Sequence, residues 1–193
     1  LRFFFIALGI HIFKKKHVMK LFILLTSLFI MTTPILFDFN KSSNLKYWRI
    51  VDDVVMGGRS NGNFKIDSNG HGKFSGEVSL KNNGGFSSLR YNFKTKDVSD
   101  YNTVVLRIKG DGHKYQFRVK TSSRDYASYI YEFQTTNDWM TIEIPFEAMD
   151  PRFRGRKLNA ANYPGQQLEE IAFLIGNKKE QSFELLLDKI SLK

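Results

Sequence analysis

The chain has 193 residues, 42% of them hydrophobic and 15% aromatic, which is enough for one domain with a sizeable core. It contains no cysteine, so disulfides, cysteine-ligated zinc and a thiol nucleophile are excluded. The formal net charge is +10. The first 36 residues contain five basic side chains and no acid, so the remaining residues have 24 basic against 19 acidic side chains, a net charge of +5. A net charge of this size does not indicate the dense basic stripe that a nucleic-acid-binding protein needs.

The N-terminal segment has the order of features of a secretory signal. Residues 19–36 read "MKLFILLTSLFIMTTPIL", in which a charged start precedes an apolar run shorter than the ~20 residues of a membrane span. We expect residues 1–36 to be a signal peptide or membrane anchor, followed by a short tether at 37–44. Residues 1–18 are interpreted as an upstream extension of the gene model or as part of two short apolar helices. No cleavage site is evident, so removal of the leader stays open, but we expect an exported or membrane-anchored bacterial protein that touches the membrane only through this segment.

Residues 45–193 alternate short apolar stretches with turn signals. In "KFSGEVSL" (73–80), every second residue belongs to one face. The Asn-Gly pairs at 61–62 and 69–70 are typical of two-residue hairpin turns. Strands are expected at 45–51, 73–80, 86–93, 103–110, 115–122, 128–135, 139–146, 170–177 and 182–192. About nine or ten strands without helical periodicity predict one all-β domain, an antiparallel β-sandwich.

The stretch "VDDVVMGGRS" (51–60) has two interpretations. As a binding loop, it would offer the carboxylates of Asp52 and Asp53 to a cation, to sugar hydroxyls or to a partner, with Arg59 and Ser60 as donors beside them. As a corner of the fold, its acidic side chains would instead accept hydrogen bonds from backbone N–H groups in the turn.

Two glycine pairs indicate turns. The first would allow positive φ in the corner while Val54 and Met56 pack inward. The second lies in "KNNGGFSSLR" (81–90), which indicates a hairpin with Phe86 as a core anchor or an aromatic platform. The glycines to which we assign this structural role are Gly57, Gly58, Gly84 and Gly85.

One long irregular stretch, residues 147–168, is rich in Arg, Asn, Gly and Pro, and loops of this length are often functional. Its arginines could pair with carboxylates of a partner or with anionic sugars, or they could form a solvated basic loop. We expect Arg154 and Arg156, together with Arg124, to be binding residues. Aromatic side chains that could stack on sugars or fill the core are Tyr126, Tyr129, Tyr131, Trp139, Phe153 and Tyr163.

Catalytic motifs are missing from the sequence. The four histidines have no metal-binding spacing, and there is no nucleophile elbow, phosphate loop or dinucleotide fingerprint. The sequence therefore predicts a protein that is not an enzyme and that needs no cofactor.

Several motifs together resemble one known family. "DDVVMGGRS" followed by "GKFSGEVSLKNNGGFSSLRYNF" is similar to the signature of the complex I intermediate-associated protein 30 family. Further matching motifs follow in order: "YQFRVKTS", "YASYIYEFQT", "WMTIEIPF", "FRGRKL", "EIAFLIGN" and "FELLLDKISL". The resemblance covers roughly residues 38–193, the whole body of the chain.

The resemblance implies a jelly-roll β-sandwich of the galactose-binding-domain-like type, a fold shared with many carbohydrate-binding modules. Mitochondrial members of the family act as assembly chaperones for respiratory complex I, the NADH:ubiquinone oxidoreductase. It therefore implies a non-catalytic, chaperone-like module that presents its loops to a protein partner; the alternative is a carbohydrate-binding module of an exported protein. In many modules of this fold an acid on the last strand helps to hold a structural calcium, which makes Asp188 a candidate, although one acid does not supply the six to eight oxygens that calcium takes in typical sites.

Overall fold

The computed structural model describes residues 34–193. The expected leader, with its extension at 1–18, lies outside the described residues except for its last three, 34–36. No helix within residues 34–193 is long and apolar enough to cross a membrane. The leader accordingly remains an expectation, and the structure bears on the domain that follows it.

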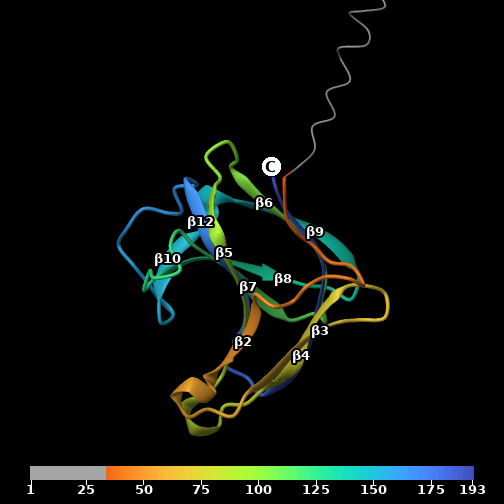
Figure 1. Cartoon of the computed structure of the whole chain (residues 1–193). Coiled ribbons are helices and arrows are strands. Elements are labelled where there is room, and N and C mark those ends of the chain that lie inside the picture. Colours follow the sequence, from red (N-terminus) through yellow and green to blue (C-terminus); the bar gives the residue numbers. More distant parts are fainter. Residues whose placement is uncertain (1–33) are drawn as a thin grey trace, which may run out of the picture. The chain divides into compact units, whose positions relative to one another are not determined.

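Two antiparallel sheets pack face to face (Figure 1). The six-stranded sheet has the order β3-β4-β13-β6-β9, with β1 also paired to β13. Its strands are β1 (Ile35–Asp38), β3 (Asn61–Ile66), β4 (Gly72–Val78), β6 (Thr103–Lys109), β9 (Trp139–Pro145) and β13 (Gln181–Leu192). Every strand pair is antiparallel, which confirms the predicted all-β sandwich.

The seven-stranded sheet has the order β11-β10-β8-β7-β12-β5-β2. Its strands are β2 (Trp48–Asp52), β5 (Ser87–Asp97), β7 (Lys114–Lys120), β8 (Ser128–Gln134), β10 (Asp150–Phe153), β11 (Arg156–Lys157) and β12 (Gln167–Ile175). Three short 3-10 helices lie in the connections: η1 (Asp53–Met56), η2 (Lys81–Asn83) and η3 (Phe146–Ala148). Both sheets therefore draw on strands from the whole length of the domain.

Alternation along strand β7 separates the core from the outer face of its sheet. In β7, Tyr115, Phe117 and Val119 are fully or almost fully buried in the core. The residues between them, Gln116 and Arg118, belong to the opposite face, because successive side chains of a strand point to opposite sides. The outer face of the seven-stranded sheet therefore carries polar side chains such as Gln116 and Arg118, with the apolar Ala172 and Ile130 buried among them.

The sandwich begins earlier than the sequence predicted. Strand β1 pairs with β13, and the rings of Phe37 and Phe39 pack against Trp48 with centroids 5.3 and 5.4 Å apart. The expected tether over 37–44 is thus wrong for these first residues, which belong to the core. The apolar residues of "ILFDFN" (35–40) follow directly on the apolar leader. The start of the strand therefore cannot be distinguished from the end of the leader in the sequence.

Strand β13 lies in the interior of the six-stranded sheet. It pairs with β4 over Gln181–Leu187 and with β6 over Leu186–Leu192. Residues of β13 therefore pair with residues about 80 to 110 positions earlier in the chain, as the registers Phe183↔Gly76 and Ile190↔Leu106 illustrate.

Candidate functional site

The carboxylate of Asp53 is the centre of the corner at 51–60. Its side chain is fully buried and accepts hydrogen bonds from the backbone N–H of Ser60 (2.9 Å) and from the Ser60 hydroxyl (2.5 Å). It also accepts bonds from the backbone N–H groups of Gly85 (2.5 Å) and Phe86 (3.2 Å). Burial raises the pKa of Asp53, but these hydrogen bonds outweigh it and hold the pKa below its ordinary value of 3.8. Asp53 and Ser60, expected among the binding residues, are enclosed in this corner and join two loops.

Asp52 and the glycines complete the corner. The Asp52 carboxylate accepts hydrogen bonds from the Gly62 N–H (2.9 Å) and the Ser87 hydroxyl (2.5 Å). Gly57 and Gly85 have φ of 90° and 137°, which favours glycine. Gly58 and Gly84 pack so closely on the Asp53 side chain that neither leaves space for a Cβ. The residues of this corner are therefore fixed by backbone geometry and by one buried carboxylate.

The apolar residues of η1 point outward. Val54, Val55 and Met56 are 60%, 73% and 63% exposed, and we call these three residues the η1 tip. The expectation that Val54 and Met56 pack inward is wrong, because Asp53 occupies the interior of this turn. Figure 1 shows η1 next to η2, and the Asn82 side-chain amide donates a hydrogen bond to the Gly57 carbonyl (3.1 Å). The tip is thus an apolar projection on a rigid base, with Arg59 exposed beside it.

The long loop at 147–168 is more ordered than its composition suggests. Residues Asp150–Phe153 form β10 at the edge of the sheet, and β11 pairs back onto it. Arg154 lies at the turn with φ 47°, its guanidinium 5.3 Å from the centre of the Phe153 ring. Arg154 and Arg156 are exposed, as is Arg124 on the β7–β8 connection. These three predicted binding residues are available to a partner.

Four arginines gather on the outer face of the seven-stranded sheet, and we call them the arginine face: Arg49, Arg90, Arg118 and Arg152. The first three lie in one row across the strands, through the registers Arg49↔Arg90, Arg90↔Ala172 and Ala172↔Arg118. Sequence reasoning missed this face. Its signal was a polar or charged residue at every second position of a strand whose alternate residues are apolar, as in "YQFRVK", but the row itself depends on long-range register.

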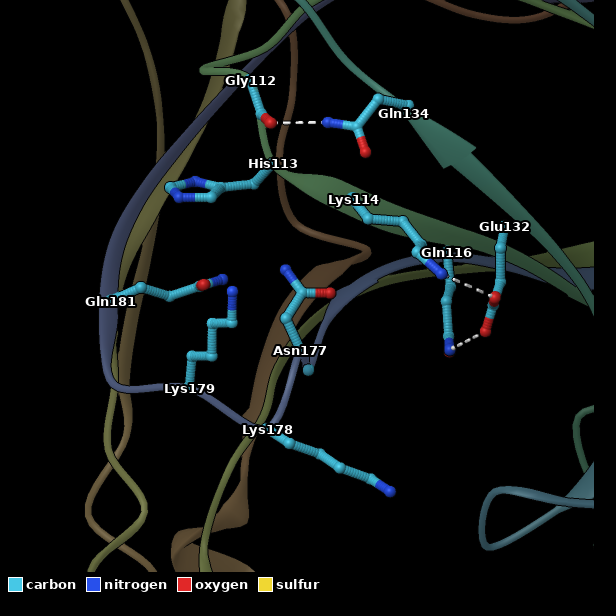
Figure 2. A pocket seen from close by; sticks show the side chains of 11 residues that line it. Gly112, His113, Lys114, Gln116, Glu132, Gln134, Asn177, Lys178, Lys179 and Gln181 are labelled. Carbon is cyan, nitrogen blue, oxygen red and sulfur yellow. Dashed lines mark hydrogen bonds and ion pairs between the residues drawn. The ribbon is translucent and has the colours of Figure 1, made fainter.

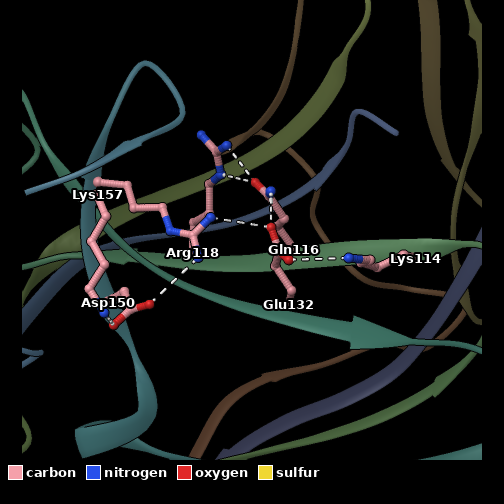
Figure 3. A network of polar contacts seen from close by, with 7 residues as sticks. Lys114, Gln116, Arg118, Glu132, Asp150 and Lys157 are labelled. Atoms are coloured by element: carbon pink, nitrogen blue, oxygen red, sulfur yellow. Dashed lines mark hydrogen bonds and ion pairs between the residues drawn. The ribbon is translucent and has the colours of Figure 1, made fainter. Parts of the chain in front are cut away.

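Two carboxylates hold most of these charges. Glu132 accepts hydrogen bonds from Lys114 (3.3 Å) and Gln116 (3.0 Å), as Figure 3 shows, and from Arg152 (3.4 Å). On the same face, beyond Arg118, Glu170 is 4% exposed and pairs with Arg49 (3.5 Å) and Arg90 (3.8 Å). The two networks lie on either side of Arg118.

Arg118 itself bonds to a neutral group. Its Nε and Nη2 atoms both donate to the Gln116 side-chain oxygen, at 3.0 and 2.6 Å. No carboxylate of residues 34–193 forms an ion pair with it. Burial first, and then the charges of Arg90 and Arg152, lower its pKa from 12.5 to about 10. The site therefore contains a half-buried cation whose nearest charged neighbours include two further cations.

A polar pocket of about 450 Å³ adjoins this network. Figure 2 shows Lys114, Gln116 and Glu132 on its sheet side, and Lys178 and Lys179 on the segment that joins β12 to β13. The Gln134 side chain donates a hydrogen bond to the Gly112 carbonyl (2.5 Å) at its upper edge. The pocket extends the basic character of the outer face toward the β12–β13 connection.

The candidate calcium residue, Asp188, lies half-buried on β13, where its backbone carbonyl accepts a hydrogen bond from the Phe39 N–H (2.9 Å). Within residues 34–193, no three or more His, Asp or Glu side chains group closely enough to hold a metal ion.

Comparison with known proteins gives two kinds of similarity. Residues 37–187 match the family model described as Complex I intermediate-associated protein 30. The chain is 24% identical to the mitochondrial Complex I intermediate-associated protein 30 of Drosophila melanogaster, over 83% of the chain and 63% of that protein. It is also 24% identical to the corresponding protein of Mus musculus, over 82% of the chain and 55% of that protein. The chain thus spans less than two thirds of the length of these relatives.

Among solved structures, the family 11 carbohydrate-binding module of the cellulase Lic26A-Cel5E of Clostridium thermocellum has a similar fold. The TM-score is 0.61 with 19% sequence identity, covering 83% of this chain and 94% of the module. A structure of the Clostridium thermocellum module in complex with a β-1,3-1,4-mixed-linked tetrasaccharide gives a TM-score of 0.59 at 19% identity, covering 82% and 94%. At this level of identity the likeness concerns the jelly-roll sandwich fold.

Proposed function

Because the chain belongs to the complex I intermediate-associated protein 30 family, we propose that it is a non-catalytic, chaperone-like module that binds a protein partner through its loops. The observation that carries this proposal is the η1 tip, where three consecutive apolar side chains face solvent on a fixed base. Exposed apolar groups that cluster on a soluble domain mark interaction sites more often than singly scattered ones do.

The base of the tip favours binding energetically. Asp53 accepts two hydrogen bonds from Ser60 within the η1 loop and two from Gly85 and Phe86 after η2, so it ties both loops together and preorganises the tip. A preorganised loop loses less conformational entropy on association than a flexible one does. Full burial of one side chain of the size of Val or Met contributes about 1.5–3 kcal/mol. Arg154 and Arg156 would add a second, polar contact from the β10–β11 turn.

The η1 tip can be tested with a single charge. We expect Val55→Asp in the full chain to reduce the amount of crosslinked partner recovered from native membranes by about tenfold or more, because an interface that buries Val55 would have to bury a carboxylate instead. The melting temperature should stay close to that of the wild type, since Val55 is 73% exposed.

The matched control is Tyr47→Asp, which places the same charge on another exposed apolar residue of the described chain. Equal recovery with both variants would remove the η1 tip from the interface. Failure of the wild-type protein to retain any partner after crosslinking would count against the proposed function itself.

Identification of the captured protein addresses the finer role. Recovery of subunits of NADH:ubiquinone oxidoreductase would support an assembly function like that named for the mitochondrial relatives. Recovery of an unrelated exported protein would support a binding function in the compartment that the leader implies. N-terminal sequencing of the native protein would establish in the same preparation whether the leader is retained.

Carbohydrate binding is the second candidate, favoured by one specific pair of side chains. Tyr126 is 72% exposed and lies edge-to-face with Phe153 of β10, with ring centroids 5.3 Å apart. Exposed aromatic rings of this kind could pack against the apolar face of a sugar. If this candidate holds, a glycan array should give selective signals that Tyr126→Ala reduces by about tenfold, while Tyr47→Ala leaves them unchanged. Flat signals over neutral and acidic glycans would exclude it.

A further inference from the structure

The arginine face has more cationic groups than its carboxylates neutralise. Glu170 forms ion pairs with Arg49 and Arg90, and Arg152 forms ion pairs with Glu132 and Asp150. Glu132 is also paired with Lys114, and Asp150 with Lys157. Across residues 34–193, Arg118 is left without a carboxylate within ion-pairing distance, although it lies between the two networks.

A half-buried cation without a counter-ion is costly for the fold. Charges removed from water are normally paired or bound to a ligand, because burying a charge without compensation is strongly unfavourable. The guanidinium carries five N–H donors in a planar fork, and the Gln116 oxygen engages only its Nε and Nη2 atoms. The buried Nε atoms of Arg90 and Arg152 also find no acceptor among the described residues. This face therefore has unused donors as well as unneutralised charge.

The sheet register places two arginines of this face on either side of one small residue. Ala172 lies between Arg90 and Arg118 in the same row, and adjacent strands are about 4.8 Å apart, so the two arginines are about 10 Å apart at the backbone. Ala172 is 2% exposed, so neighbouring side chains already cover it, and an anion here would contact the guanidinium groups above this residue. We propose that Arg118, flanked by Arg90 and Arg152, binds a carboxylate of an acidic peptide segment at this place. The proposal rests on the proposed function, since it assigns the partner an acidic segment.

The chemistry of the face favours a carboxylate on a peptide over a sugar. A guanidinium fork matches the two oxygens of a carboxylate, and paired charge-assisted bonds of this kind are among the strong ones. In the described chain, the aromatic side chains of β7 and β8 belong to the core side of the sheet, so the row around Arg118 offers no ring for a sugar to stack on. The carboxylates of an acidic peptide are spaced along its backbone, so more than one of them can contact the cations that lie in a row across the strands.

The experiment uses an acetylated and amidated hexaglutamate peptide as the probe, followed by fluorescence anisotropy on the full chain. We expect binding that weakens as salt is added, and Arg118→Gln should weaken it by about tenfold or more. The affinity of Arg118→Lys should lie between those of the wild type and Arg118→Gln, because lysine keeps the positive charge but lacks the planar guanidinium fork. The matched control is Arg124→Gln, which removes the same charge from an exposed loop and should change affinity less than about threefold.

A thermal melt separates binding from a structural role. Arg118→Gln removes a cation that faces other cations, so its melting temperature should equal or exceed that of the wild type. A lower melting temperature with unchanged peptide affinity would overturn the proposal, and so would equal loss of affinity in Arg124→Gln. Tighter binding of polygalacturonate or inorganic phosphate than of hexaglutamate, lost in Arg118→Gln, would also overturn it in favour of another anion. The result is independent of Val55→Asp, so the acidic-segment proposal and the η1 tip can fail separately.

Discussion

Replacing Asp53 with alanine is expected to lower the free energy of unfolding by about 3–5 kcal/mol. The variant removes the acceptor for four donors: the hydroxyl and amide of Ser60 and the amides of Gly85 and Phe86. A buried donor left without a partner costs about 1–3 kcal/mol, and the total stays below the sum because water enters as the two loops separate. Urea denaturation followed by circular dichroism measures the change. Asp138→Ala, at an exposed position, should stay within about 0.5 kcal/mol of the wild type.

The same carboxylate gives the fold a defined response to acid. The pKa of folded Asp53 lies below 3.8, the ordinary value that it has when unfolded, so the unfolded state takes up a proton first as the pH falls. Its contribution to stability is therefore complete above pH 3.8 and is lost as the pH drops through the lower, folded pKa. Urea midpoints of the wild type and Asp53→Asn, measured from pH 7 downward, should approach one another below pH 3.8. A constant difference over this range would show that the charge of Asp53 contributes nothing.

The second large effect is expected for Phe39→Ala, at about 3–5 kcal/mol. Phe39 is 5% exposed, and its ring lies 4.5 Å from Phe37 and 5.4 Å from Trp48 between centroids. Gly72 packs directly against the ring, so no neighbouring side chain at that position can expand into the cavity. The measurement is again urea denaturation, with Tyr47→Ala as a control on an exposed aromatic residue. A change below about 0.5 kcal/mol would mean that residues 37–44 are a tether after all.

The strands with regular alternation were predictable from the sequence. Expected strands at 103–110 and 115–122 correspond to Thr103–Lys109 and Lys114–Lys120, because each buries every second residue. Strands β10 and β11 could not be recognised: the first contains a proline among charged residues, and the second has two residues. Both exist because the edge of β8 offers unpaired backbone groups, which is a property of the assembled sheet.

The candidate sites were predictable only in part. The unusual composition of 51–60 singled out that loop, but whether Asp53 or Val55 faces solvent depends on what the loop packs against. Arg118 is one of many basic residues in the sequence. What sets Arg118 apart is that it lies two strands from Arg90, with Ala172 between them. These residues are far apart in the sequence, so local sequence patterns cannot predict that they are neighbours.

The interior position of β13 has a consequence for synthesis of the protein. While the ribosome is still making the preceding residues, β4 and β6 each lack the neighbour that will separate them, and both present open backbone edges and apolar side chains. The nascent polypeptide must therefore stay unaggregated until residues 181–192 have left the exit tunnel, and closure of the sheet then depends on contacts between distant positions, which form slowly.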